Sequence, residues 1–225
     1  MADILRVSEV YTSIQGEGPN VGKPTQFVRF GGCNLRCPGW PCDTQHAIDP
    51  QYRNEWERHT PESLLELVDD WPKRVTLTGG EPFLQQKDAL DGFIHGLSMR
   101  GYEIDCFTNG TLEWPICARN FGMQMILDWK LPGSGEDHLD HQRAVNWRSE
   151  FDTYVKFTIA DEEDYVKAGD IASRHGIPYK RIYLGVAWGR LKESELAEWI
   201  FRDELDVKLN VQVHNYIWDR EQRGI

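Results

Sequence analysis

The sequence predicts an α/β fold in the form of an incomplete, open (β/α) barrel. Short β-branched or apolar stretches alternate along the chain with amphipathic stretches of helical length, which is typical of βα units around a parallel sheet. The chain has 225 residues, whereas a closed eightfold barrel typically takes about 250. We therefore expect residues 1–225 to form a single domain around a sheet that does not close.

The expected elements follow from local patterns. Thr60 is a suitable N-cap and Pro61 suits the first helical turn, which predicts a helix over 61–71. Residues 74–78 are β-branched and stop at Gly79 and Gly80, as a buried strand before a turn does. The same patterns predict strands at 26–30, 102–107, 123–127, 153–159, 181–184 and 207–213, helices at 84–100, 162–175 and 193–201, and loops at 38–51 and 132–140.

Composition excludes several classes of function. Lys and Arg number 25 and Asp and Glu 36, so the net charge is −11 and the overall field repels a nucleic acid. No stretch approaches the roughly 20 apolar residues that span a bilayer. Asp3, Arg6 and Glu9 stand where a signal peptide needs an apolar run. We expect a cytoplasmic protein that binds neither nucleic acid nor membrane.

Three of the five cysteines, Cys33, Cys37 and Cys42, lie within ten residues in the spacing C-x3-C-x4-C, directly after a predicted strand. Cys106 and Cys117 stand apart and are expected to be small buried residues. The cluster fits a disulfide framework badly and indicates a metal. Two interpretations are open: a zinc site that His46 completes, in a module without catalysis, or a 4Fe–4S cluster whose fourth iron is left for a small molecule.

A second motif favours the cluster. The loop Gly32–Cys37 together with Thr78-Gly79-Gly80-Glu81-Pro82 resembles the radical S-adenosylmethionine (SAM) enzymes, which typically carry C-x3-C-x2-C. Relative to that spacing, Gly39 and Pro41 are two additional residues. The resemblance implies a barrel of the radical SAM type, a 4Fe–4S cluster on the three thiolates, and SAM with its ammonium near Glu81.

Over nearly the whole chain, the sequence resembles the 7-carboxy-7-deazaguanine synthase family. The matching segments are Tyr11–Pro19 with its Gln-Gly-Glu-Gly, Arg29, Thr44, Thr78, Thr108–Thr111, Asp128–Pro132, Lys156 and Gln212-Val213-His214. The family resemblance implies a carbon–nitrogen lyase that contracts the ring of 6-carboxytetrahydropterin to 7-carboxy-7-deazaguanine, with loss of ammonia, in queuosine-type biosynthesis. It also implies Mg²⁺, a homodimer and an electron donor such as a flavodoxin. Glycyl-radical activases share the cysteine loop but are not expected to share the Gln-Gly-Glu-Gly opening or the Gln-x-His ending.

The resemblance assigns site residues in three groups. Substrate binding falls to Ile14, Gln15, Gly16, Glu17, Arg29, Thr78 and His214; SAM binding to Gly79, Gly80, Glu81, Thr108, Asn109, Asp128, Trp129, Lys130 and Lys156; and metal binding to Cys33, Cys37, Cys42 and, for Mg²⁺, Thr44.

Residue chemistry suits these assignments, and each has an alternative. Arg29 suits a carboxylate and His214 suits a hydrogen bond or proton transfer, but an ion-paired strand arginine and a hydrogen-bonded core histidine are open readings. Thr44 either contributes oxygen to Mg²⁺ or caps the turn that leaves the cysteine loop. Lys130 and Lys156 either reach SAM or cover apolar surface with their stems.

Overall fold

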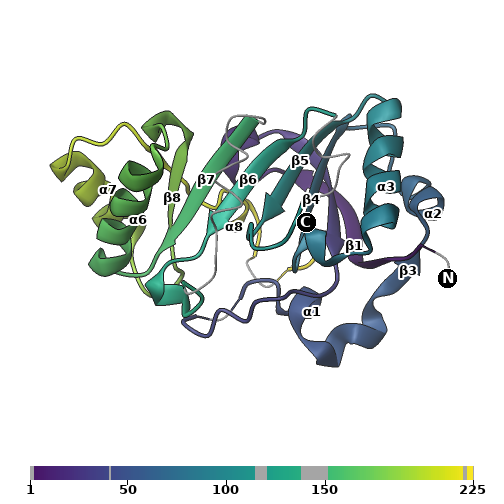
Figure 1. The fold of residues 1–225 in the computed structure, drawn as a ribbon, viewed down its shortest axis with the longest axis horizontal. Coiled ribbons are helices and arrows are strands. Elements are labelled where there is room, and N and C mark those ends of the chain that lie inside the picture. Colours follow the sequence, from purple (N-terminus) through teal and green to yellow (C-terminus); the bar gives the residue numbers. More distant parts are fainter. Residues whose placement is uncertain (1–2, 41, 115–120, 138–151, 220–221, 225) are drawn as a thin grey trace.

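A computed structural model describes residues 3–40, 42–114, 121–137, 152–219 and 222–224. In this part of the chain nine strands form one open sheet in the order β3-β1-β2-β4-β5-β6-β7-β8-β9 (Figure 1). Neighbours from β2 to β9 are parallel, and β1 is antiparallel to β2 and β3. The strands are β1 (Leu5–Ile14), β2 (Pro24–Phe30), β3 (Glu57–His59), β4 (Arg74–Gly79), β5 (Glu103–Thr108), β6 (Gln124–Trp129), β7 (Asp152–Ile159), β8 (Ile182–Val186) and β9 (Lys208–Leu209). The predicted open α/β architecture is confirmed.

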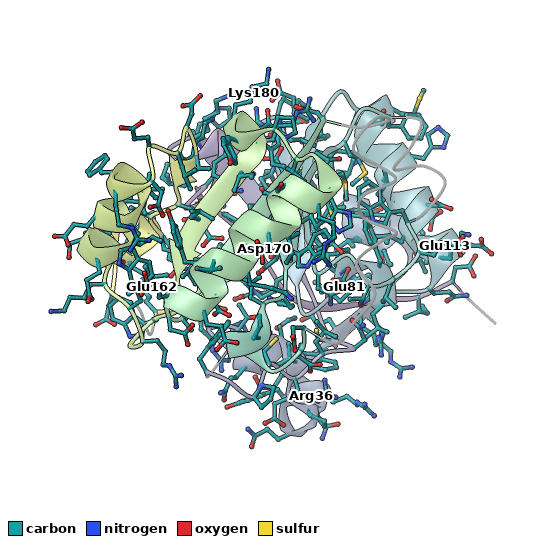
Figure 2. All side chains as sticks on the ribbon, turned by 60° about the vertical axis from the view of Figure 1, so that its left-hand side comes forward. Arg36, Glu81, Glu113, Glu162, Asp170 and Lys180 are labelled. Atoms are coloured by element: carbon teal, nitrogen blue, oxygen red, sulfur yellow. The ribbon has the colours of Figure 1, made fainter. Side chains whose placement is uncertain are left out.

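The helices of the described residues are α1 (Gln45–Ile48), α2 (Pro61–Leu65), α3 (Lys87–Met99), α6 (Glu162–His175), α7 (Glu193–Arg202) and α8 (His214–Ile217). Apolar residues of α2, α3, α6 and α7 join one face of the sheet in a continuous core. Figure 2 shows Glu162 and Asp170 on α6 and Arg36 at the cysteine loop. None of these helices is long and apolar enough to span a bilayer.

Side chains along the parallel strands point alternately to the apolar core and to the opposite, polar face of the sheet, which we call the concave face. Val28, Leu77, Leu127 and Phe157 belong to the core. Their strand neighbours Arg29, Thr78, Asp128 and Lys156 point the other way because successive side chains alternate between faces. Register sets Arg29 beside Thr78 and Asp128 beside Lys156. The concave face and the carboxyl ends of the parallel strands therefore carry the polar residues.

Three predicted elements are shorter than expected. The helix predicted over 84–100 spans Lys87–Met99. The helix from Pro61 ends at Leu65 rather than at residue 71. Beyond it the Gln26 side chain binds both the amide and the carbonyl of Asp69, at 2.7 Å each, and replaces helical partners. The last strand is Lys208–Leu209 rather than 207–213, because the Asn210 side chain accepts a bond from the amide of Gly18 and the chain leaves the sheet.

Strand β1 is absent from the sequence prediction. A bulge shifts its register between Val7 and Glu9. Leu5 and Val7 therefore face the core, whereas Glu9 pairs with Arg29 on the concave side. The irregularity breaks the period of two on which strand prediction depends.

Candidate active site

Gly79, the last residue of β4, and Gly80 hold together two turns at the carboxyl ends of the parallel strands, an edge of the sheet that we call the rim. Gly79 has φ +122°, and a Cβ built there would lie 2.3 Å from the carbonyl oxygen of Phe30. A Cβ on Gly80 would lie 2.0 Å from the carbonyl oxygen of Gly32. The amides of Gly80 and Glu81 donate to these same two oxygens at 3.0 and 2.8 Å. The glycines are thus required for close contact with the backbone that leads into the cysteine loop.

Glu81 connects this turn to the turn after β5. Its side chain is fully buried; Figure 2 labels its position. It accepts hydrogen bonds from the Phe83 amide at 3.0 Å, the Thr108 hydroxyl at 2.7 Å and the Asn109 amide at 2.8 Å. Burial raises the pKa of Glu81, and the three donors oppose that rise. Three donors of the protein thus bind this carboxylate, and its contact with the ammonium of SAM stays a prediction.

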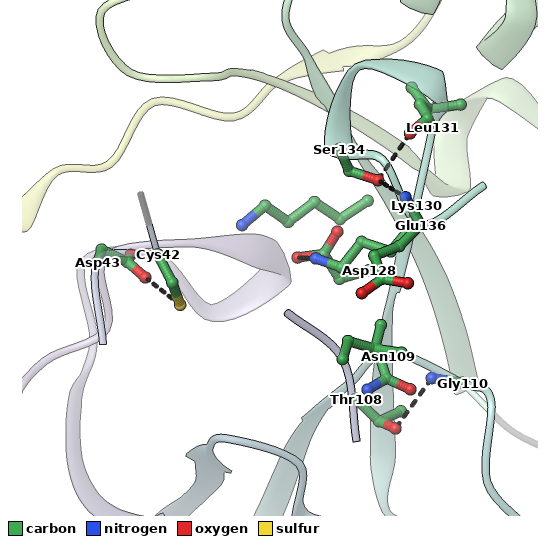
Figure 3. A network of polar contacts seen from close by, with 12 residues as sticks. Cys42, Asp43, Thr108, Asn109, Gly110, Asp128, Lys130, Leu131, Ser134 and Glu136 are labelled. Atoms are coloured by element: carbon green, nitrogen blue, oxygen red, sulfur yellow. Dashed lines mark hydrogen bonds and ion pairs between the residues drawn. The ribbon is translucent and has the colours of Figure 1, made fainter. Parts of the chain in front are cut away.

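The three clustered thiols lie near a buried cation. Burial raises the pKa of all three, that of Cys37 to about 11, and Lys130 opposes each rise. Burial lowers the pKa of Lys130, but Asp128, at 3.0 Å, and the thiols outweigh it and raise the pKa overall. Figure 3 shows Cys42 and Asp43 across from Asp128, Lys130 and Asn109. A positive charge here favours the thiolate form that binds iron.

The contact of His46 with Glu9 takes away the fourth ligand that a zinc site here was expected to use. Among the described residues no three His, Cys, Asp or Glu side chains meet at a point where one ion would bind. A 4Fe–4S cluster places each thiolate on a different iron, so its cysteines do not need to meet at one point. His46, the expected fourth zinc ligand, bonds instead to Glu9 at 2.9 Å. Cys106 is buried in the core, as predicted, and Pro41 and Cys117 lie outside the described residues.

The segment after β1 crosses the concave face. Gln15 donates to the Thr76 hydroxyl at 3.0 Å and accepts from the Glu17 amide at 3.3 Å. Its side chain therefore holds the segment in place, and its pairing with an edge of the substrate stays a prediction. The Glu17 carboxylate contacts the Lys156 ammonium at 2.8 Å. Burial lowers the pKa of Lys156, and Glu17 outweighs this effect and raises it.

Arg29 lies in a nearly buried network rather than in a surface ion pair. Its Nε donates to Glu9 at 2.6 Å and its Nη2 to the Tyr11 hydroxyl at 2.7 Å, and its side chain is 13% exposed. Glu9 also binds His46, four residues beyond the third cysteine. These contacts fix the plane of the guanidinium and connect it to the cysteine loop.

His214 begins α8, five residues beyond the end of β9 rather than directly after a strand. A Cβ on Gly16 would lie 2.0 Å from its Nδ1, and the Val213 amide donates to the Gly16 carbonyl at 3.1 Å. Burial lowers the pKa of His214, while Glu17 and Asp43 oppose the change. Burial thus favours the neutral imidazole, which lies beside the segment that carries Glu17.

The remaining predicted residues divide between the two faces. Trp129 packs against Phe157 and against His175 of α6, with ring centroids 6.3 and 5.3 Å apart. Its side chain belongs to the core, because side chains alternate along β6 and Asp128 and Trp129 point to opposite faces. The assignment of Trp129 to the SAM site stays a prediction. Ile14 ends β1 and Thr78 lies beside Arg29.

Two further contacts tie the rim to the cysteine loop. Asn109 donates to the Asn34 side chain at 3.0 Å. The Thr44 hydroxyl lies 3.3 Å from the Cys42 sulfur and makes no capping bond to α1. The alternative role of Thr44 as a cap is thus not observed.

Sequence reasoning missed Glu9, Tyr11 and Asp43 as site residues. Glu9 and Tyr11 come from the unpredicted β1, where only the partial alternation from Leu5 to Val7 signals a strand. Against burial, which lowers the pKa of both groups, the negative charge of Asp43 raises the pKa of Arg29 and that of His214. Its position directly after Cys42, an expected cluster ligand, is the sequence signal that could have identified it.

Comparisons with known proteins agree with this geometry. The family described as 4Fe-4S single cluster domain matches residues 14–127. The chain is 35% identical to 7-carboxy-7-deazaguanine synthase of Chlorobaculum tepidum, over 98% of this chain and 97% of that protein. It is 31% identical to the Clostridium acetobutylicum protein of the same name, over 98% and 99%. The crystal structure of QueE from Escherichia coli shares the fold, with a TM-score of 0.73, 21% identity, and coverage of 93% and 94%.

Proposed function

The chain belongs to the 7-carboxy-7-deazaguanine synthase family, and from this premise we propose that it converts 6-carboxytetrahydropterin to 7-carboxy-7-deazaguanine as a radical SAM carbon–nitrogen lyase. The observation that carries the proposal is the placement of Arg29, Glu17, Lys156 and His214 on one concave face, beside a rim that holds three clustered thiols. When bound, SAM and the reduced cluster supply the hydrogen-abstracting chemistry. The protein binds the reactants, orients them and excludes water.

Arg29 receives the carboxylate of the pterin. Glu9 and Tyr11 engage Nε and one N–H of Nη2, so those two bonds leave the edge between Nη1 and Nη2 for a carboxylate. That edge offers two parallel charge-assisted bonds. Because both contacts orient the guanidinium beforehand, little side-chain entropy is lost when the substrate binds.

Glu17 and Lys156 face the ring of the substrate. The Glu17 carboxylate accepts from the amide and amino edge of the pterin while it keeps its contact with Lys156. His214, whose pKa burial lowers, hydrogen-bonds the substrate carboxylate or accepts a proton at its unprotonated ring nitrogen near neutral pH.

The rim binds the cofactors. Cys33, Cys37 and Cys42 hold the cluster, and Lys130, fixed by Asp128, reaches the carboxylate of SAM. Glu81 shapes the SAM site by holding the Gly79–Gly80 turn against the Asn109 turn, while the backbone of these turns contacts the ligand.

Thr44 contributes one oxygen to Mg²⁺, which prefers oxygen ligands and keeps several waters. We further propose that residues 1–225 form one domain, that the protein is a homodimer, and that a flavodoxin-type donor reduces the cluster. One continuous sheet and one apolar core support the single domain.

An anaerobic assay of the reconstituted protein tests this function. Protein, 6-carboxytetrahydropterin, SAM, Mg²⁺ and a reductant are incubated, and the products are identified by mass spectrometry. The proposal requires 7-carboxy-7-deazaguanine, with loss of product in an Arg29→Ala variant that still cleaves SAM. SAM cleavage without this product in the wild-type protein refutes the proposed substrate.

A further inference from the structure

A short turn after β6, residues 131–136, lies against the cysteine loop. It consists of a 3₁₀ turn at Pro132–Ser134 followed by Gly135 in the left-handed region at φ +75°. Ser134 is fully buried; its hydroxyl donates to the Leu131 carbonyl at 2.7 Å and accepts from the Glu136 amide at 3.1 Å. Figure 3 shows both bonds on the side of the site that faces Cys42. The 131–136 turn is thus internally braced.

The same turn is fixed to the first turn of α6. Asp164 is fully buried and accepts from the amides of Gly133 at 2.8 Å and Ala160 at 3.0 Å. A Cβ on Gly133 would lie 2.3 Å from an oxygen of Asp164. A buried carboxylate with two backbone donors resists displacement because moving it would leave those donors unpaired. The 131–136 turn is therefore a rigid support.

The cysteine loop contacts the 131–136 turn at a residue that is additional to the C-x3-C-x2-C spacing. Gly39, one of the two residues that lengthen the loop, donates to the Ser134 carbonyl at 3.2 Å. A Cβ on Gly39 would lie 1.7 Å from the Gly133 carbonyl oxygen, a distance that no side chain permits. On the other side, Gly135 packs against Pro38, 2.7 Å from a built Cβ. The longer loop and the 131–136 turn are matched in shape.

Glu136 makes the contact nearest to a cluster ligand. One oxygen of its carboxylate accepts from the Arg36 amide at 2.7 Å and the Cys37 amide at 3.3 Å. Cys37 has φ +43°, the left-handed region that is costly for any residue with a side chain. Two consecutive amides with a left-handed residue form a nest that binds an anion. The carboxylate therefore stabilises the backbone conformation that aims the Cys37 thiol.

We propose that Glu136 is a positioning residue for the iron–sulfur cluster, because it fills the Arg36–Cys37 nest and holds Cys37 in its ligating conformation on the 131–136 turn. This role requires the cluster that the 4Fe-4S family match indicates. It does not require the pterin substrate. Failure of the proposed reaction therefore leaves this inference open to its own test.

The test compares Glu136→Ala and Glu136→Gln with Asp137→Ala, a matched change at the exposed neighbouring carboxylate. Each protein is loaded anaerobically with cluster, and iron release to a ferrous chelator and the electron paramagnetic resonance spectrum of the reduced cluster are recorded. Loss of bonds to a charged acceptor predicts about tenfold faster release from Glu136→Ala, with an altered spectrum. Glu136→Gln keeps a carbonyl acceptor and is expected to restore most of the retention, and Asp137→Ala to match the wild type. Wild-type retention in Glu136→Ala, or equal losses in the alanine and glutamine variants, overturns the proposal.

A second variant guards against a failure of Glu136→Ala to fold. Gly39→Ala pushes the loop away from the Gly133 carbonyl without touching Glu136. It is expected to release iron faster than the wild type, and urea unfolding of the cluster-free protein is recorded alongside to show that the variant is folded. If folded Gly39→Ala releases iron at the wild-type rate, the 131–136 turn does not support the cluster loop at Gly39.

Discussion

Glu81→Ala separates two roles for the buried carboxylate at the rim. If Glu81 mainly braces two turns, its loss weakens the protein even without a ligand. If it is mainly an ammonium acceptor, its loss weakens SAM binding and leaves the cofactor-free protein unchanged. The three protein donors on Glu81 predict the first result.

The magnitude follows from the groups left unpaired. The amides of Phe83 and Asn109 both lose their acceptor in Glu81→Ala, in residues that are 8% and 7% exposed. A buried unsatisfied donor costs about 1–3 kcal/mol, so two cost about 2–6 kcal/mol. The Thr108 hydroxyl can rotate to another acceptor in Glu81→Ala, so it adds little to the loss of stability. Removal of a buried charge, whose pKa is raised by burial, offsets part of the loss. We expect a net loss of about 2–4 kcal/mol.

Urea unfolding of cluster-free protein measures this loss. Glu113→Ala removes an exposed carboxylate near the same rim and serves as the control (Figure 2). Glu81→Ala should unfold at a clearly lower urea concentration than Glu113→Ala, with a similar slope. Equal midpoints for the two variants, together with a selective loss of SAM affinity, refute the bracing role.

Three further changes probe other contacts. Arg29→Lys replaces a planar fork by a point charge, so substrate binding, measured by calorimetry, should weaken more than about tenfold while SAM affinity is retained; equal losses for both ligands contradict this. Thr44→Val should keep the cluster and lose Mg²⁺ stimulation of turnover, and unchanged Mg²⁺ dependence removes Thr44 from the metal site. Burial raises the pKa of Glu9, but bonds from His46 and Arg29 outweigh it and lower the pKa below its usual 4.5. That stabilisation is present above pH 4.5 and lost as pH falls through the folded pKa, so Glu9→Gln should lose less stability than the wild type in acid unfolding; identical acid profiles argue against it.

The fold was predictable where local signals are complete. Helix α6 has the predicted bounds because Asp161 caps it with a bond to the Asp164 amide at 3.0 Å and Gly176 ends it in the left-handed region. The parallel strands were found from their apolar alternation. Strand β1 was missed because its bulge interrupts that alternation.

The site was predictable in its residue types and less so in its contacts. Motif spacing located the thiols and the glycine turn, yet it gave no sign that Glu81 binds Thr108 or that Gln15 binds Thr76, 61 positions away. Such pairs depend on the register of strands that are distant in sequence. Motif spacing likewise gave no sign that the Trp129 side chain packs against His175 of α6.

We propose that this concave site contracts a carboxylated pterin and, as the family resemblance implies, regenerates SAM in each turnover. Its most direct test counts 7-carboxy-7-deazaguanine, ammonia and consumed SAM in one anaerobic reaction with excess substrate and limiting SAM. The account predicts product and ammonia in equal amounts, with several products for each SAM consumed. Stoichiometric conversion of SAM to deoxyadenosine and methionine without deazaguanine would contradict it.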